Sequence, residues 1–127
     1  MKPEAKPAPE VAPASGCTND DGNIAVRAGA TCTLSGTRVP GNINVDAGGT
    51  LVASNVTVEG NIQGDGHARV SVTGGYVDGS IQLKDGGAVH VASVRINGNL
   101  QCEGNSPAPT GGGNQVSGNK EDQCAGL

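Results

Sequence analysis

The sequence of 127 residues contains almost no aromatic side chains: Tyr76 is the only one, with no Phe and no Trp. A globular domain of this size normally relies on several rings to fill its core. Their scarcity argues against a layered sandwich and favours a narrow tube in which Ile, Val and Leu do the packing. The 22 glycines supply many places where such a tube can turn a corner.

Long apolar runs and concentrated basic charge are also missing. No stretch of 18 apolar residues occurs, so we expect no membrane-spanning helix. The 8 Lys and Arg are scattered singly in a chain of net charge −4, which argues against nucleic-acid binding. The opening segment Met1 to Ala5 lacks the apolar stretch of a signal peptide. We therefore expect either a cytosolic protein or a mature chain whose signal has been removed.

The four cysteines favour the second alternative. Four cysteines allow three pairings, and their positions favour Cys17–Cys32 at the start of the folded part and Cys102–Cys124 at its end. A zinc site is a weak alternative, because the chain has no Cys-x-x-Cys spacing. Disulfides indicate an oxidising compartment, so we expect a secreted, periplasmic or envelope-held protein.

The chain divides into two parts of different composition. Residues 1–16 are rich in Pro and Ala and have almost no packing residues, so we expect a disordered spacer there. Residues 17–127 form the expected folded domain.

A glycine recurs at a fixed interval through this domain. It stands at Gly22, Gly41, Gly60, Gly79 and Gly98, each 19 residues apart, and Gly118 follows after 20. Within each unit, apolar residues alternate in three short stretches, which predicts three strands per unit. A period near 20 with this content indicates a solenoid. We therefore predict an all-β fold, a right-handed parallel β-helix of about five triangular coils stacked about 4.8 Å apart and closed by a disulfide at each end.

Two features of the repeat carry structural expectations. Asn or Ser follows each repeat glycine, and we expect these side chains to hydrogen-bond to one another along a column while the glycine supplies a positive φ. The last unit replaces its second strand by the Pro- and Gly-rich segment 105–113. Because proline cannot donate to a β-ladder, we expect 105–113 to be a capping loop that prevents end-to-end growth.

These residues resemble the parallel β-helix proteins over residues 22–119. The Gly-Asn-Ile corners and aliphatic columns are also similar to those of bactofilin-type polymer-forming solenoids. The tail from Asn99 through Cys124 resembles the ends of small secreted bacterial β-helix proteins of no known activity. The resemblance implies the fold and a bacterial envelope or exterior location, and it carries over no site residue.

Two groups of outward residues are candidates for a binding surface. Asp46 and Asp65 would lie one coil apart, as paired carboxylates or a Ca²⁺ site require, although a solvated charge ladder is the simpler interpretation. His67, Tyr76 and Arg95 belong to an irregular third coil, in which Gly64 and Gly75 take inward positions. They could contact sugar or protein, or the coil could simply be pinched inward with Tyr76 stacked on Arg95.

No nucleophile, phosphate-binding loop or cofactor fingerprint is recognisable, so we expect no enzyme activity, no metal and no cofactor. The sequence predicts a structural or recognition module whose partner is a second copy of the chain, another envelope protein or a glycan. The alternatives are a self-assembling polymer-forming solenoid and a carbohydrate-binding or carbohydrate-active β-helix.

Overall fold

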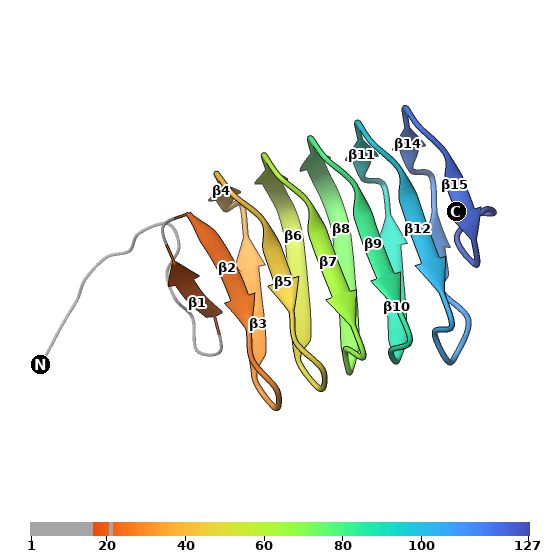
Figure 1. Ribbon diagram of the computed structural model, residues 1–127. Coiled ribbons are helices and arrows are strands. Elements are labelled where there is room, and N and C mark those ends of the chain that lie inside the picture. Colours follow the sequence, from red (N-terminus) through yellow and green to blue (C-terminus); the bar gives the residue numbers. More distant parts are fainter. Residues whose placement is uncertain (1–16, 21) are drawn as a thin grey trace, which may run out of the picture.

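A computed structural model describes residues 17–20 and 22–127 (Figure 1). Within these residues the chain contains strands and turns and no helix. The spacer expected at 1–16 lies outside the described residues. The strands follow one another around a tube that advances as a right-handed parallel β-solenoid, with β1 and β15 at opposite ends (Figure 1).

Two sheets form the wall of the tube. One face, sheet A, has the strand order β1-β2-β5-β7-β9-β12-β15. After β1 its six strands are parallel and mark about five turns. The bounds in this sheet are β1 (Cys17–Asp20), β2 (Asn23–Val26), β5 (Ile43–Val45), β7 (Ile62–Asp65), β9 (Ile81–Lys84), β12 (Leu100–Glu103) and β15 (Lys120–Asp122).

The second sheet, sheet B, contains the other two sides of each coil. Its strands are β3 (Thr31–Ser35), β4 (Arg38–Val39), β6 (Thr50–Val58), β8 (Arg69–Val77), β10 (Ala88–Ala92), β11 (Arg95–Ile96), β13 (Thr110–Gly112) and β14 (Gln115–Val116). The predicted second and third strands run together as one in β6 and β8. In each coil a left-handed residue makes the corner between these two sides, with φ from 52 to 70°; these residues are Gly36, Asn55, Gly74, Ser93 and Gly113. In β8 the following Gly75 is left-handed as well, with φ 94°.

The core consists of columns of like residues from successive coils. The register aligns Ile24, Ile43, Ile62, Ile81 and Leu100 in one column, and each is at most 1% exposed. Burial of such a side chain contributes about 1.5–3 kcal/mol. The interior thus packs aliphatic side chains without a single ring except that of His67, as the scarcity of aromatics predicts.

The repeat glycines have a role other than the expected one. Of these six glycines only Gly22 has a positive φ. A Cβ on Gly79 would lie 2.7 Å from the carbonyl oxygen of Gly60 and closer than van der Waals contact to Asn61 Oδ1, and the other repeat glycines except Gly22 are similarly crowded. The expectation of a positive φ is therefore wrong, and close approach between coils excludes a side chain.

The Asn column also differs from its prediction. From Asn23 to Asn99, each side chain accepts a hydrogen bond from the backbone of the next coil instead of bonding to its neighbour's side chain. The backbone N–H of Asn42 donates to Asn23 Oδ1 at 2.8 Å, that of Asn61 to Asn42 Oδ1 at 2.8 Å, and that of Ser80 to Asn61 Oδ1 at 2.7 Å. The column therefore provides hydrogen-bond acceptors for the backbone N–H groups at the corner where the chain leaves sheet B.

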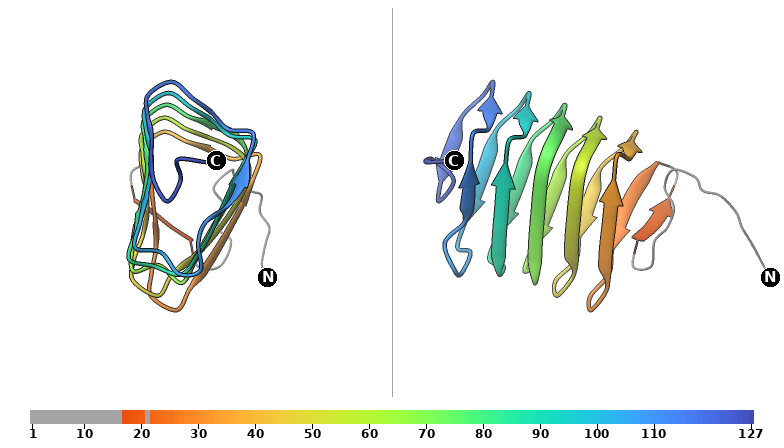
Figure 2. Two further views of the ribbon diagram at one scale, coloured as in Figure 1. Left: turned by 90° about the vertical axis from the view of Figure 1, so that its right-hand side faces the viewer. Right: turned by 180° about the vertical axis from the view of Figure 1, so that it is seen from behind.

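Both ends are closed by disulfides in the predicted pairing, Cys17–Cys32 and Cys102–Cys124. At the first end β1 turns back and pairs antiparallel with β2, which the repeat did not indicate. At the other end the final turn crosses the opening of the tube (Figure 2). Leu127 packs against the core there, and its carbonyl accepts a hydrogen bond from the side chain of Asn114 at 3.2 Å.

The segment 105–113 is a different structure from the expected capping loop. Thr110–Gly112 forms β13, which continues sheet B beside β10, so most of the coil is completed. The prolines precede this strand at positions where their missing N–H is not required. Residues 123–127, which follow β15, cover the end instead.

Candidate functional site

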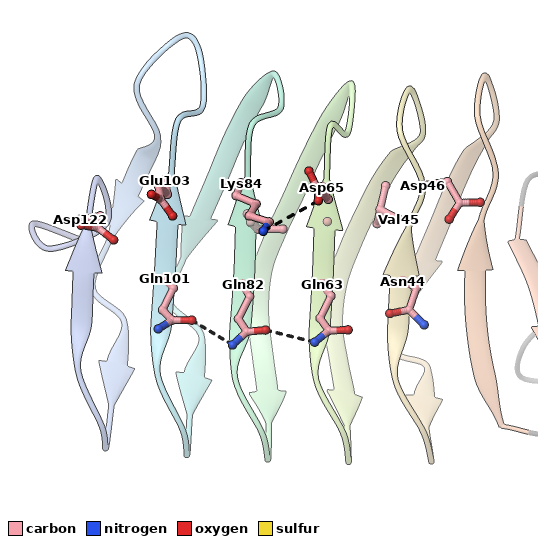
Figure 3. Close-up of a pocket in the computed structure, with 12 residues that line it drawn as sticks. Asn44, Val45, Asp46, Gln63, Asp65, Gln82, Lys84, Gln101, Glu103 and Asp122 are labelled. Carbon is pink, nitrogen blue, oxygen red and sulfur yellow. Dashed lines mark hydrogen bonds and ion pairs between the residues drawn. The ribbon is translucent and has the colours of Figure 1, made fainter.

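The described structure has a groove of about 740 Å³ along the outer face of sheet A (Figure 3). It runs across successive coils, so each coil contributes the same positions of its strand. Its lining residues are Asn44, Val45, Asp46, Gln63, Gly64, Asp65, Gln82, Leu83, Lys84, Gln101, Glu103 and Asp122. Four carboxylates and one ammonium group give the groove a negative charge at neutral pH.

A column of glutamine amides forms the floor of the groove (Figure 3). Gln63 Nε2 donates to Gln82 Oε1 at 3.1 Å, and Gln82 Nε2 donates to Gln101 Oε1 at 2.9 Å. Gln101 Nε2 then donates to Glu121 Oε1 at 2.7 Å. Because an amide has two N–H groups and two lone pairs, each of these glutamines retains one donor and at least one acceptor for a ligand.

Asp46 and Asp65 lie on this groove, in successive coils as predicted, since the preceding residues Val45 and Gly64 are paired in register. Lys84 Nζ approaches Asp65 Oδ2 at 4.0 Å, and both side chains are more than half exposed. Such an exposed pair contributes about 0–1 kcal/mol. Among the described residues no group of three or more His, Cys, Asp or Glu is arranged to hold a metal ion.

Tyr76 and Arg95 lie on a different face, the outer surface of the third side of the coils. They are neighbours in adjacent coils, with β8 and β11 paired at these positions. The hydroxyl of Tyr76 donates to Asp78 Oδ1 at 2.9 Å, and Asn97 Nδ2 donates to the same oxygen at 3.2 Å. The hydrogen bond to Asp78 raises the pKa of Tyr76 above its ordinary value of 10.0.

The prediction that His67 shares an outward surface with Tyr76 and Arg95 is wrong. Its side chain is 1% exposed and points into the tube. The sequence shows the reason only when the coils are aligned: Gly64 leaves an inward position empty, and the imidazole fills that space. A Cβ on Gly64 would lie 2.9 Å from His67 Nδ1. His67 therefore belongs to the core and contributes no contact to the surface.

The burial of this ring has an electrostatic consequence. Desolvation lowers the pKa of His67 below 6.5, and the Gly87 backbone and the charge of Asp65 offset only part of that shift. The Gly87 backbone lies near the ring, but neither ring nitrogen meets hydrogen-bond geometry with a partner within the described residues. The imidazole is therefore neutral at neutral pH.

Sequence reasoning missed the glutamine column, although the sequence carries its signal. The third residue after each repeat glycine reads Ala25, Asn44, Gln63, Gln82, Gln101 and Glu121. The alternation predicts that this position points outward. Aligning all coils at that position reveals a run of amides, which a search for single motifs does not detect.

In the part of the chain that the structure describes, no helix is long and apolar enough to cross a membrane. No family model matches this chain, and neither the curated proteins nor the solved structures contain a significant match.

Proposed function

We propose that the protein is a non-enzymatic structural or recognition module of the bacterial envelope or exterior, built as a rigid rod with closed ends. The observation that carries this proposal is the closure of both ends. A disulfide joins the first coil to the strand that precedes it, and a second joins β12 to the final turn.

Closed ends favour a discrete rod over a polymer. A parallel solenoid grows when the exposed strands of its last coil pair with the first coil of another copy. Here β1 occupies the free edge of β2 in the antiparallel direction, and residues 123–127 cover the opposite opening. Disulfides persist in oxidising compartments, which supports an exterior or periplasmic location. The bacterial assignment rests on the resemblance of the tail.

Sedimentation velocity on the non-reduced protein over a hundredfold concentration range tests the closed rod. We expect one species near the chain mass of 12.4 kDa at every concentration. Large particles that grow with concentration would instead support the self-assembling polymer-forming solenoid. The same run after reduction of the disulfides is the matched control, since it opens the ends without changing the sequence.

A second candidate function is carbohydrate binding along the groove on sheet A. It is supported by the glutamine column, in which each side-chain amide keeps a free donor and a free acceptor, and these groups repeat about every 4.8 Å along the rod. Sugar hydroxyls are donors and acceptors, so an extended glycan lying along the axis could bond to several coils at once. The groove has no aromatic lining residue on which a sugar ring could stack, so we expect weak, additive binding.

NMR titration with short cello- and chito-oligosaccharides tests this second function. The two candidate surfaces are distinguished by Asp65→Ala, which alters the groove, and by Tyr76→Ala, which alters the other face. Loss of binding in the first variant alone places the glycan on sheet A, and loss in the second alone places it on the Tyr76–Arg95 surface. No shift in the unmodified protein at millimolar oligosaccharide would refute glycan binding.

A further inference from the structure

His67 is a buried polar side chain without a hydrogen-bond partner, at a position with an instructive counterpart in another coil. The alignment of coils places His67 in the same column as Gly48, Gly86 and Asn105. Asn105 is also buried, at 4% exposed, but its amide is satisfied. Its Nδ2 donates to the Leu83 carbonyl at 2.9 Å, and its Oδ1 accepts from the Gly86 backbone at 3.1 Å.

The imidazole of His67 has no equivalent partners. Both Nδ1 and Nε2 are buried without a hydrogen bond within the described residues. A buried polar group without a hydrogen bond is unfavourable, and a buried charged one is considerably more so. The corner of the third coil therefore tolerates the neutral ring and opposes its protonated form.

The ring is held tightly by two glycines from its own coil and the next. A Cβ on Gly86 would lie 2.5 Å from both ring nitrogens, and a Cβ on Gly64 would lie 2.9 Å from Nδ1. Both ring nitrogens are shielded from solvent, so a proton on the ring could not be solvated in place.

The charged groups around this corner compensate a protonated ring only in part, because the charge of Asp65 raises the pKa of His67 by less than burial lowers it. Asp65 turns outward to Lys84, and the pair is mostly exposed. None of the charged side chains at the adjoining corners hydrogen-bonds to the ring; they are Asp46, Asp65, Arg69, Lys84 and Asp85.

We propose that His67 is an acid-sensitive latch of the third coil. When the imidazole binds a proton, it leaves the core, and the corner 64–68 opens. The backbone there is suited to such a movement, because Gly64 and Gly66 flank Asp65 and the facing corner contains Gly86 and Gly87. Since Gly64 and Asp65 also line the groove on sheet A, opening changes the surface that a ligand would contact.

The direction of the pH dependence follows from linkage. The open corner exposes an ordinary imidazole with a pKa of about 6.5, whereas burial lowers the pKa of His67 in the closed form. The open form binds more protons, so the closed form is fully stable above about pH 6.5 and loses stability as the pH falls below it. The opening equilibrium constant then rises by up to about tenfold per pH unit, until the lowered pKa of the closed form is reached.

Amide hydrogen exchange on the intact, non-reduced protein tests the latch. The reporters are the amides of Gly66, Ala68 and Gly87, which donate to Lys84, Gly49 and His67 carbonyls at 3.0, 2.8 and 2.8 Å. Their protection factors, corrected for the intrinsic exchange rate at each pH, should fall by up to about tenfold per pH unit below 6.5. The amide of Gly60, at another corner, should keep its protection.

The ring signals in the unmodified protein supply a measurement that needs no variant. We expect the ring of His67 to titrate below its ordinary value of 6.5, because burial lowers its pKa. If the ring titrates at 6.5 or above, or if the corner amides are equally protected at pH 7 and pH 5, the proposal is overturned.

His67→Asn introduces the residue that the same column already carries at position 105 and that does not titrate. The variant should retain the native protection at pH 7 and show no acid response at the corner. An acid response of unchanged size would show that a group other than His67 drives the opening, which also overturns the proposal. If the variant does not fold, the ring titration and the exchange of the unmodified protein decide the question.

Discussion

Replacing the repeat glycine Gly79 by Ala should destabilise the solenoid strongly, although its backbone angles suit any residue. The new Cβ would lie 2.7 Å from the Gly60 carbonyl oxygen and 3.0 Å from Asn61 Cγ, and still closer to Asn61 Oδ1. To avoid this contact the Asn61 side chain must move, and it then loses its hydrogen bond from the Ser80 amide.

The size of the effect follows from two terms. Leaving the Ser80 amide unsatisfied costs about 1–3 kcal/mol. Shifting the coil to relieve the contact with the Gly60 carbonyl is overpacking, which costs about 1–3 kcal/mol. The expected loss is therefore about 2–6 kcal/mol, a large share of the 5–15 kcal/mol by which a domain is typically stable. At the lower limit it corresponds to a fall of about 8 °C in Tm.

Urea and thermal unfolding of the non-reduced protein, followed by far-ultraviolet circular dichroism, would measure this loss. Gly79→Asn is a second test of close approach, because Asn also carries a Cβ and tolerates more backbone conformations than Ala. We expect it to be at least as destabilising as Ala. Gly36→Asn is the matched control, because Gly36 has φ +64° with no atom within 4 Å of a Cβ, and Asn55 occupies the same corner one coil later.

Two results would refute this reasoning. A Gly79→Ala variant within about 0.5 kcal/mol of the native protein would show that the coils can separate at no cost. A Gly79→Asn variant as stable as Gly36→Asn would show that contact between coils does not select glycine at this position. In the double variant Asn61→Ala/Gly79→Ala, the loss beyond that of Asn61→Ala measures the part due to the Gly60 carbonyl.

Two further predictions concern the end of the rod and its second face. Replacing Cys102 and Cys124 together by Ser removes a link across 22 residues, which should cost about 3 kcal/mol and raise amide exchange in the final turn first; an unchanged Tm would show that this disulfide does not stabilise the end. Asp78→Asn should bring the pKa of Tyr76 down toward 10.0, because the hydrogen bond to the carboxylate is the main cause of its increase. Spectrophotometric titration of the tyrosinate measures this change, and an unchanged pKa would contradict the assignment.

The fold was predictable because the same pattern of glycine and apolar residues recurs in every coil. The inward columns recur at the same offset from each repeat glycine, so alternation and period together predicted the parallel solenoid of about five turns. The disulfide pairing was predictable for a related reason, since residues about one coil apart in sequence are neighbours in space. The cysteine pairs are separated by 15 and 22 residues, close to the length of one coil.

The candidate surface was less accessible to prediction. Asp46 and Asp65 were placed correctly on one face, because outward positions follow from the strand period. The glutamine column was equally readable, but only from all coils together. His67 could not be placed, because the direction of its side chain depends on the space that Gly64 and Gly86 leave around it.

By itself the sequence determined the coil length, the columns that face the core and the pairing of the cysteines, since each is set by spacing along the chain. The tertiary structure alone decided the features that occur once. They are the antiparallel return of β1, the closure by residues 123–127 and the inward turn of His67. Each of these features depends on packing against residues of another coil or at an end of the stack. The repeat does not predict which residues meet there.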